Sequence, residues 1–176
     1  HRALPMVIGC ETITPELSSY PGIHIDNVAA AKEATHYLLG LGHERIAFIY
    51  GEHKTLLTQD RENGYREAMT EANKTIDSGW VVEGKLTLEG AIEATEGLLA
   101  NPIRPTAIFC ANDEMAMGCL HAVKAAGLRV PDDISVVGFD VSRYALVLGP
   151  PLSAGRRRAR FCGGGGLRRL RAAGEG

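Results

Sequence analysis

The stretch from Pro105 to Asp140 constrains the fold of this chain more than any other part of it. An apolar run reaches Cys110, a polar corner and a helical pattern follow, and Gly127 and then Pro131 stop the helix before a second apolar run. Strand, helix and strand in this order predict a β-α-β unit whose two strands are buried in a parallel sheet. Ligands bind beside the carboxyl ends of strands in open α/β sheets, so the polar residues that end each run are candidate ligand-binding residues.

Strand-like and helical patterns also alternate before this unit, from Ile46 onward. The alternation predicts an α/β fold with a doubly wound parallel sheet and right-handed crossovers. An earlier helical pattern begins after Asp26, a predicted N-cap, and stops at Gly42. The expected strands lie at 4–9, 23–25, 46–51 and 80–82, and the expected helices lie at 27–42, 60–73 and 88–99.

Composition places the chain among soluble globular proteins, since 45% of its residues are hydrophobic and 23% are charged. Its four cysteines are scattered without the spacing of a metal site or of a disulfide framework. The sequence contains no secretory signal and no long apolar span. We therefore expect a cytoplasmic protein with no metal, no cofactor and no membrane association.

Charge is distributed unevenly between the body of the chain and its end. Residues 1–155 contain 12 Lys and Arg against 20 Asp and Glu, a net charge of −8, whereas the last 21 residues contain seven arginines and one glutamate. An acidic body lacks the basic surface that binds nucleic acid phosphates. The end is rich in Gly, Arg and Ala, with four consecutive glycines at 163–166, and this composition predicts disorder.

Four segments carry a family likeness. They are I-D-N-V-A-A-A-K-E-A-T-H-Y-L-L-G-L-G-H-E-R-I-A-F-I-Y-G at 25–51, R-E-N-G-Y-R-E-A at 61–68, P-T-A-I-F-C-A-N-D-E-M-A-M-G at 105–118 and V-P-D-D-I-S-V-V-G-F-D at 130–140. In order and spacing they resemble the LacI/GalR family of bacterial transcription regulators, over about residues 4–153. The resemblance implies two Rossmann-like lobes, a small effector in the cleft between them, a homodimer, and a helix-turn-helix headpiece that binds operator DNA.

The resemblance also divides the chain into three parts. Residues 1–43 are expected to form the end of the N-terminal lobe, and residues 44–153 the C-terminal effector-binding lobe, of the periplasmic-binding-protein-like type I. Residues 154–176 are expected to form a disordered tail outside the family pattern. The headpiece is expected to be missing, so operator DNA would be bound only through a headpiece that this chain lacks. The abrupt change of composition near Ser153 leads to the hypothesis of a frameshift or a sequencing error there.

Three polar residues are the main candidates for effector binding. Arg61 is expected at the start of a helix, and in the family the matching arginine hydrogen-bonds the effector; a solvated arginine in a first helical turn is the alternative. Asn112 and Asp140 end consecutive strands, where an amide can donate and accept and a carboxylate can accept two hydroxyl donors. Helix capping is the competing role for this pair.

Four further residues are expected at the same cleft. Asp26, contributed by the other lobe, either caps a helix or contacts the effector. Thr55 and Leu57 are expected to line the pocket from the loop before Arg61. Leu86 stands where the family often has an aromatic residue. Because leucine cannot stack on a base, it favours a sugar over a nucleobase as the effector.

The leading interpretation is the effector-binding and dimerisation core of a cytoplasmic repressor that senses a small molecule of the sugar or nucleoside class. A periplasmic sugar-binding protein of a transporter shares this fold and is the alternative. An enzyme is not expected, because no P-loop, no dinucleotide-binding glycine motif and no nucleophile paired with a base is present. His36 and His43 have no third ligand nearby, so they are expected on a helix surface and at its C-terminal cap.

Overall fold

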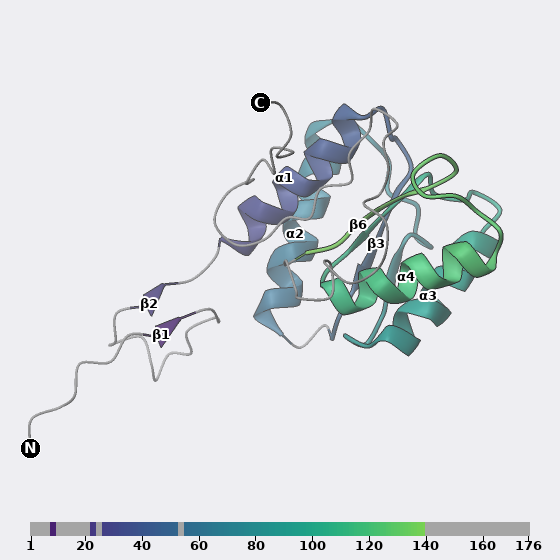
Figure 1. Ribbon diagram of the computed structural model, residues 1–176. Helices are drawn as coiled ribbons and strands as arrows, with labels where there is room; N and C mark the ends of the chain where they lie inside the picture. Colours follow the sequence, from purple (N-terminus) through teal and green to yellow (C-terminus); the bar gives the residue numbers. More distant parts are fainter. Residues whose placement is uncertain (1–7, 10–21, 24–25, 53–54, 140–176) are drawn as a thin grey trace, which may run out of the picture.

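A computed structural model describes residues 8–9, 22–23, 26–52 and 55–139 of the chain (Figure 1). Strand and helix alternate along this part, as the sequence predicts. The strands are β1 (Ile8–Gly9), β2 (Gly22–Ile23), β3 (Ile46–Tyr50), β4 (Val81–Glu83), β5 (Ala107–Cys110) and β6 (Ser135–Val137). The helices are α1 (Asn27–Gly40), α2 (Leu56–Glu71), α3 (Leu88–Ala100) and α4 (Asp113–Ala125).

Four of the described strands form one parallel sheet in the order β4-β3-β5-β6. The chain therefore extends from β3 first to one side of the sheet and then to the other. Helices α1 and α2 pack together on one face, and α3 and α4 pack together on the opposite face (Figure 1). Strands β1 and β2 pair in parallel in a separate two-stranded sheet. This layered arrangement confirms the predicted α/β fold with a doubly wound parallel sheet.

The core is built around the two central strands, β3 and β5, whose side chains are almost all buried. Near-continuous apolar sequence is what a parallel strand covered on both faces requires. The Phe48 ring stacks on the Tyr65 ring with centroids 5.2 Å apart, and it lies 5.1 Å from the Phe109 ring. The Tyr65 hydroxyl donates to the Ile46 carbonyl oxygen at 2.7 Å. Tyr65 therefore fixes α2 to the centre of the sheet.

One glycine lets each pair of helices approach closely. A Cβ at Gly64 of α2 would overlap the carbonyl oxygen of Val28 in α1. A Cβ at Gly118 of α4 would likewise overlap the carbonyl oxygen of Leu88 in α3. Because real side chains do not make such contacts, any other residue at Gly64 or Gly118 would push the two helices apart.

The predicted start of α2 is wrong by one turn. The helix begins at Leu56 rather than at Asp60, because Thr55 has extended backbone angles and its hydroxyl accepts from the Thr58 N–H at 3.3 Å. Thr55 is therefore an N-cap. Leu57 lies in the first helical turn and Arg61 in the second, so neither the loop expected for Leu57 nor the helix start expected for Arg61 is observed.

The other predicted boundaries are close to the observed ones. Asp26 caps α1 as predicted, and the chain leaves this helix through Gly42, whose φ of 88° suits glycine. The expected first strand at 4–9 lies mostly outside the described residues. Helix α1 packs along α2, and the boundary predicted between residues 43 and 44 stays a prediction.

Candidate functional site

The carboxyl ends of β3, β5 and β6 meet on one side of the sheet, which we call the carboxyl edge. Parallel pairing produces this arrangement, and Ile49 near the end of β3 lies beside Cys110 at the end of β5. Helices α2 and α4 begin after strands end there, so their first backbone N–H groups open toward this edge. The residues that follow β5 and β6, namely Ala111, Asn112 and Phe139, therefore gather at the carboxyl edge.

Arg61 of α2 is buried at the carboxyl edge, with only 4% of its surface exposed. Its Nε donates to Asn27 Oδ1 at 3.0 Å, and its Nη1 donates to the carbonyl oxygen of Ala111. The guanidinium carbon lies 3.7 Å from the centroid of the Phe139 ring, a cation–π contact. A planar group with several fixed donors is suited to making these contacts at once. Arg61 therefore joins α1, α2 and the residues that follow β5 and β6.

Two of the residues that Arg61 contacts are sequence neighbours of the other main candidates. Ala111 immediately precedes Asn112, and Phe139 immediately precedes Asp140. The structure thus places Arg61 against the residues that lead into both positions, while Asp140 itself lies outside the described residues. The alternative of a solvated first-turn arginine is wrong, since Arg61 is buried in the second turn. Effector binding by these residues stays a prediction.

Asn112 and Asp26 are both helix N-caps. Asn112 Oδ1 accepts from the Met115 N–H at 2.8 Å at the start of α4. Asp26 Oδ1 accepts from the Ala29 N–H at 2.9 Å at the start of α1. Asn112 is half-buried and Asp26 is exposed. A cap uses one acceptor atom of the side chain and leaves the second polar atom to another partner, so capping and effector binding are compatible at both positions.

The other three candidates lie in the segments that follow β3 and β4, namely Thr55, Leu57 and Leu86. The Thr55 hydroxyl oxygen caps α2 and lies 2.9 Å from that of Thr58, and Leu57 is half-buried. Leu86 follows β4 with a φ of 57°, a backbone conformation that residues with a side chain rarely adopt. Its side chain packs on Gly51, where a Cβ would overlap it. Leu86 thus presents an aliphatic surface beside the end of β3.

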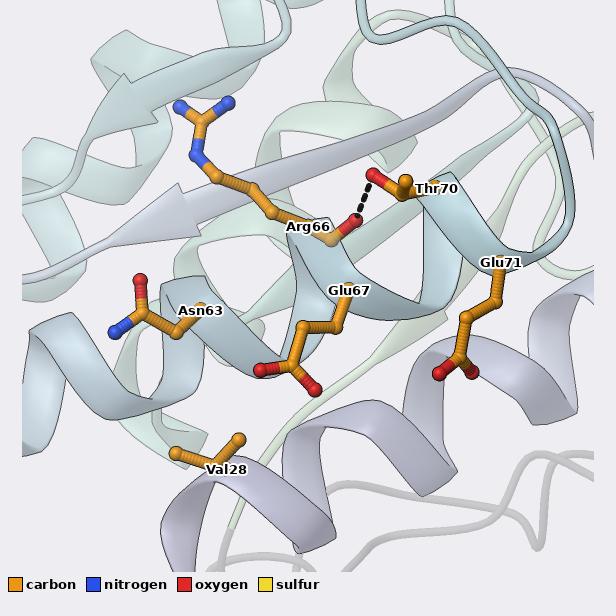
Figure 2. A pocket seen from close by; sticks show the side chains of 6 residues that line it. All are labelled: Val28, Asn63, Arg66, Glu67, Thr70 and Glu71. Atoms are coloured by element: carbon orange, nitrogen blue, oxygen red, sulfur yellow. Dashed lines mark hydrogen bonds between the residues drawn. The ribbon is translucent and has the colours of Figure 1, made fainter.

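A separate hollow of about 450 Å³ lies along α1 and α2 (Figure 2). It is lined by Val28, Asn63, Arg66, Glu67, Thr70 and Glu71. Figure 2 shows the two glutamates of α2 pointing toward α1. None of the predicted site residues that the structure describes lines this hollow.

The charges around the hollow are paired across the two helices. Lys32 Nζ of α1 lies 2.6 Å from Glu71 Oε1 and 3.4 Å from Glu67 Oε2. Its hydrogen bond lowers the pKa of Glu71, and His36 adds to that effect. Sequence reasoning missed this cluster. The signal available for it was the pair of acids four residues apart on α2, which places both carboxylates on one helical face.

The two histidines considered as metal ligands have other partners. His36 is exposed on α1, as predicted, with Nε2 at 3.1 Å from Glu71 Oε2. The backbone N–H of His43 donates to the Leu38 carbonyl oxygen at 3.2 Å, as a C-terminal cap does, but its ring contacts Thr106 and Ser135. Within the described ranges, no three residues among His, Cys, Asp and Glu are placed to hold a metal ion together. None of the described helices is at once long and apolar enough to pass through a bilayer.

Known proteins share both the sequence and the fold of this chain. The profile of the periplasmic binding protein-like domain family matches residues 35–173. The HTH-type transcriptional repressor CytR of Escherichia coli (strain K12) is 38% identical over 152 residues, which make up 86% of this chain and 44% of CytR. The crystal structure of a LacI-family regulatory protein from Chloroflexus aggregans is similar with a TM-score of 0.74 at 33% identity, over 82% of this chain and 51% of that one. The transcriptional regulator CelR in complex with cellobiose is similar with a TM-score of 0.69 at 34% identity, over 77% of this chain and 42% of that one.

The extent of these matches bears on the predicted organisation. The chain spans less than half of the length of CytR. The family match spans residues 35–173, and the predicted end of the family pattern near Ser153 stays a prediction. The assignment of residues 154–176 to a disordered tail stays a prediction, since these residues lie outside the described ranges.

Proposed function

Because the chain belongs to the periplasmic binding protein-like family, with relatives that are LacI-family regulators, we propose that it forms the effector-binding part of a bacterial transcription repressor. In this proposal a small sugar-like molecule binds at the carboxyl edge, in a cleft between this lobe and a second one. The observation that supports it most is the position of Arg61, which is buried against the residues that precede Asn112 and Asp140.

The proposed site uses Arg61 as its anchor. Asn27 and Ala111 take two of its five N–H donors, and Phe139 lies against the guanidinium face. These contacts fix the orientation of the guanidinium before any effector arrives, which reduces the ordering cost of binding. Asp140 accepts hydroxyl donors from the effector in this scheme.

The remaining proposed contacts surround that anchor. Asn112 and Asp26 add polar contacts through the atoms that their caps do not use. Thr55, Leu57 and Leu86 form part of the wall.

The side chains favour a sugar over a nucleobase as the effector. Leu86 offers an aliphatic surface that suits the apolar face of a sugar ring and cannot stack on a base. Carboxylate and amide groups suit a ligand with several hydroxyl groups. The similar regulator CelR has been solved in complex with cellobiose, and this precedent supports a sugar-class ligand here.

Several features of the whole repressor follow from the same proposal. Operator DNA is bound through a headpiece outside this chain, the repressor is a cytoplasmic homodimer, and it catalyses no reaction. The name of its relative CytR favours a repressor over a transporter's binding protein. The packing of α1 on α2, together with the hydrogen bond from Arg61 to Asn27, supports a lobe boundary before Asn27 instead of after His43.

A thermal-shift screen tests the proposal. The chain is heated with pentoses, hexoses, disaccharides and nucleosides, and a sugar at 100 times its dissociation constant is expected to add about 2.7 kcal/mol of stability. The Asp140→Asn variant is expected to lose the shift while its own unfolding midpoint stays within about 2 °C of the parent. Asp132→Asn changes an exposed residue and serves as the control, and it is expected to keep the thermal shift that the sugar causes. A sugar that shifts Asp140→Asn as strongly as the parent would contradict the assignment of Asp140.

A further inference from the structure

The ring of His43 connects three segments on the side of the sheet opposite Arg61, which we call the amino edge. His43 Nδ1 lies 3.1 Å from Thr106 Oγ1, and Nε2 lies 2.9 Å from Ser135 Oγ. Thr106 immediately precedes β5, and Ser135 is the first residue of β6. One half-buried imidazole therefore joins the loop between α1 and β3 to the amino ends of two neighbouring strands.

The direction of these hydrogen bonds follows from the Thr106 hydroxyl. It has one proton and donates it to the carbonyl oxygen of Arg45 at 3.3 Å. We therefore assign Thr106 Oγ1 as the acceptor of the His43 Nδ1–H. In a neutral imidazole the other nitrogen is then an acceptor, so the Ser135 hydroxyl donates to Nε2. The neutral Nδ1–H tautomer satisfies both hydroxyl groups at once.

Protonation of the ring conflicts with this arrangement. A charged imidazole carries N–H groups at both nitrogens and has no acceptor. Ser135 would have to turn its hydroxyl proton away from His43 and find a new acceptor. Only 8% of Ser135 is exposed, so water is a poor substitute. The bond that ties the ring to β6 is therefore weakened by protonation.

Charged residues of both signs lie on the segments that meet at this edge. They are Glu44, Arg45, Lys74, Asp77, Arg104, Arg129, Asp132 and Asp133. Glu44 is paired with Lys74, and Asp132 and Asp133 are paired with Arg129. The neutral ring is therefore favoured by its hydrogen bonds and not by the balance of nearby charges.

We propose that His43 is a pH-sensitive clamp that holds the amino ends of β5 and β6 to the preceding loop while its ring is neutral and loosens them when the ring is protonated. The stabilisation is present above the titration range of the ring and is lost as the pH falls through it. An ordinary histidine titrates at about pH 6.5, and the comparison below is made on both sides of that value. The clamp involves no effector and acts whether or not a sugar binds at the opposite edge.

Thermal unfolding of three proteins tests the clamp at about pH 7.5 and about pH 5.5. The parent chain is compared with His43→Gln, which can donate and accept but does not titrate, and with His121→Gln, which removes an exposed histidine of α4. Between the two pH values the midpoint of the parent is expected to fall by about 2–4 °C more than that of His43→Gln. His121→Gln is expected to follow the parent. Equal pH dependence in the parent and in His43→Gln would overturn the proposal.

A second measurement needs no variant, so it decides the matter even when His43→Gln does not fold. Nitrogen NMR of the histidine rings in the parent distinguishes a protonated nitrogen from an acceptor nitrogen. At about pH 7.5 the ring of His43 is expected to carry its proton on Nδ1 alone, and acidification is expected to shift the backbone amide signals at the start of β5 and β6. A proton on Nε2 at about pH 7.5, or a ring already charged there, would refute the clamp.

Discussion

Each edge of the sheet is held by one basic side chain, but the two side chains differ in burial and in chemistry. Arg61 at the carboxyl edge is 4% exposed, and a guanidinium keeps its charge throughout the pH range in which proteins fold. His43 at the amino edge is half-buried, and its hydrogen bonds fit the neutral ring. The side chain that joins the segments is therefore a charged guanidinium at the carboxyl edge and, in the proposal above, a neutral imidazole at the amino edge.

The charged side chain of Arg61 and the neutral ring of His43 have different roles in the proposals above. A buried charge is costly unless hydrogen bonds and other contacts compensate for it, and Asn27, Ala111 and Phe139 compensate Arg61. A fold that needed only stability at this edge could use an uncharged residue. In the proposals above, the charge of Arg61 serves the effector site, whereas the contacts of His43 join segments of the sheet.

Replacement of Arg61 by methionine is expected to have the largest effect on stability. Methionine keeps the length of the side chain but removes the bonds to Asn27 and Ala111 and the contact with Phe139. We expect a loss of about 3 kcal/mol in the free energy of unfolding. Urea unfolding at neutral pH measures it.

Arg66→Met provides the matched control for that experiment. Arg66 is an exposed arginine of the same helix, with Nη2 at 2.7 Å from Glu62 Oε1. Its replacement is expected to change the free energy of unfolding by less than about 0.5 kcal/mol. Equal losses in Arg61→Met and Arg66→Met would contradict the role of Arg61 in holding the carboxyl edge, because Arg61 would then contribute no more than a surface arginine.

Thr106→Val is expected to have a moderate effect at the amino edge. Valine has nearly the same shape but lacks the hydroxyl that lies 3.1 Å from His43 Nδ1 and donates to the Arg45 carbonyl oxygen. We expect a loss of about 1–2 kcal/mol in urea unfolding. The control is Thr70→Val, whose exposed hydroxyl donates only within α2, to the Arg66 carbonyl oxygen at 2.8 Å. A loss no larger than that of this control would show that His43 does not depend on Thr106.

Local patterns in the sequence were sufficient to predict much of the fold. The β-α-β unit between Pro105 and Asp140 was predicted from two apolar runs and a helical pattern, and β5, α4 and β6 lie within it. Helix α3 was predicted almost to the residue. The start of α2 was placed one turn too late, because the apolar spacing begins after Asp60 and the cap at Thr55 carries no apolar signal.

The contacts at the two edges were less accessible from sequence. His43 is 63 residues from Thr106 and 92 residues from Ser135, and no local pattern encodes such partners. The burial of Arg61 depends on Asn27, 34 residues earlier, and on Ala111, 50 residues later. Family resemblance pointed to Arg61 as a site residue, but the contacts that orient it required the coordinates. The sequence predicts that Leu86 differs from the family only in lacking an aromatic ring. Its positive φ is not predicted, because glycine or asparagine usually occupies a position with positive φ.

Asp133→Asn is expected to have the smallest effect, and one that is confined to acid. Asp133 lies just before β6 at the amino edge, and both of its oxygens accept from Arg129 at 2.8 Å. The side-chain hydrogen bond from Arg129, helped by the backbone N–H of the same residue, lowers the pKa of Asp133 to about 2. Because the folded-state pKa lies below that of an unfolded aspartate, the stabilisation is complete above about pH 5 and is lost as the pH falls toward 2. Unfolding midpoints measured from neutral pH down into this range should therefore fall less steeply in Asp133→Asn than in the parent.

The control for this experiment is Asp132→Asn. The carboxylate of Asp132 lies 3.8 Å from Arg129 Nη1, and its replacement should keep the slope of the parent. Since this response lies well below the titration range of histidine, an Asp133→Asn slope equal to that of the parent at every pH would instead leave His43 as the source of the acid sensitivity of the amino edge.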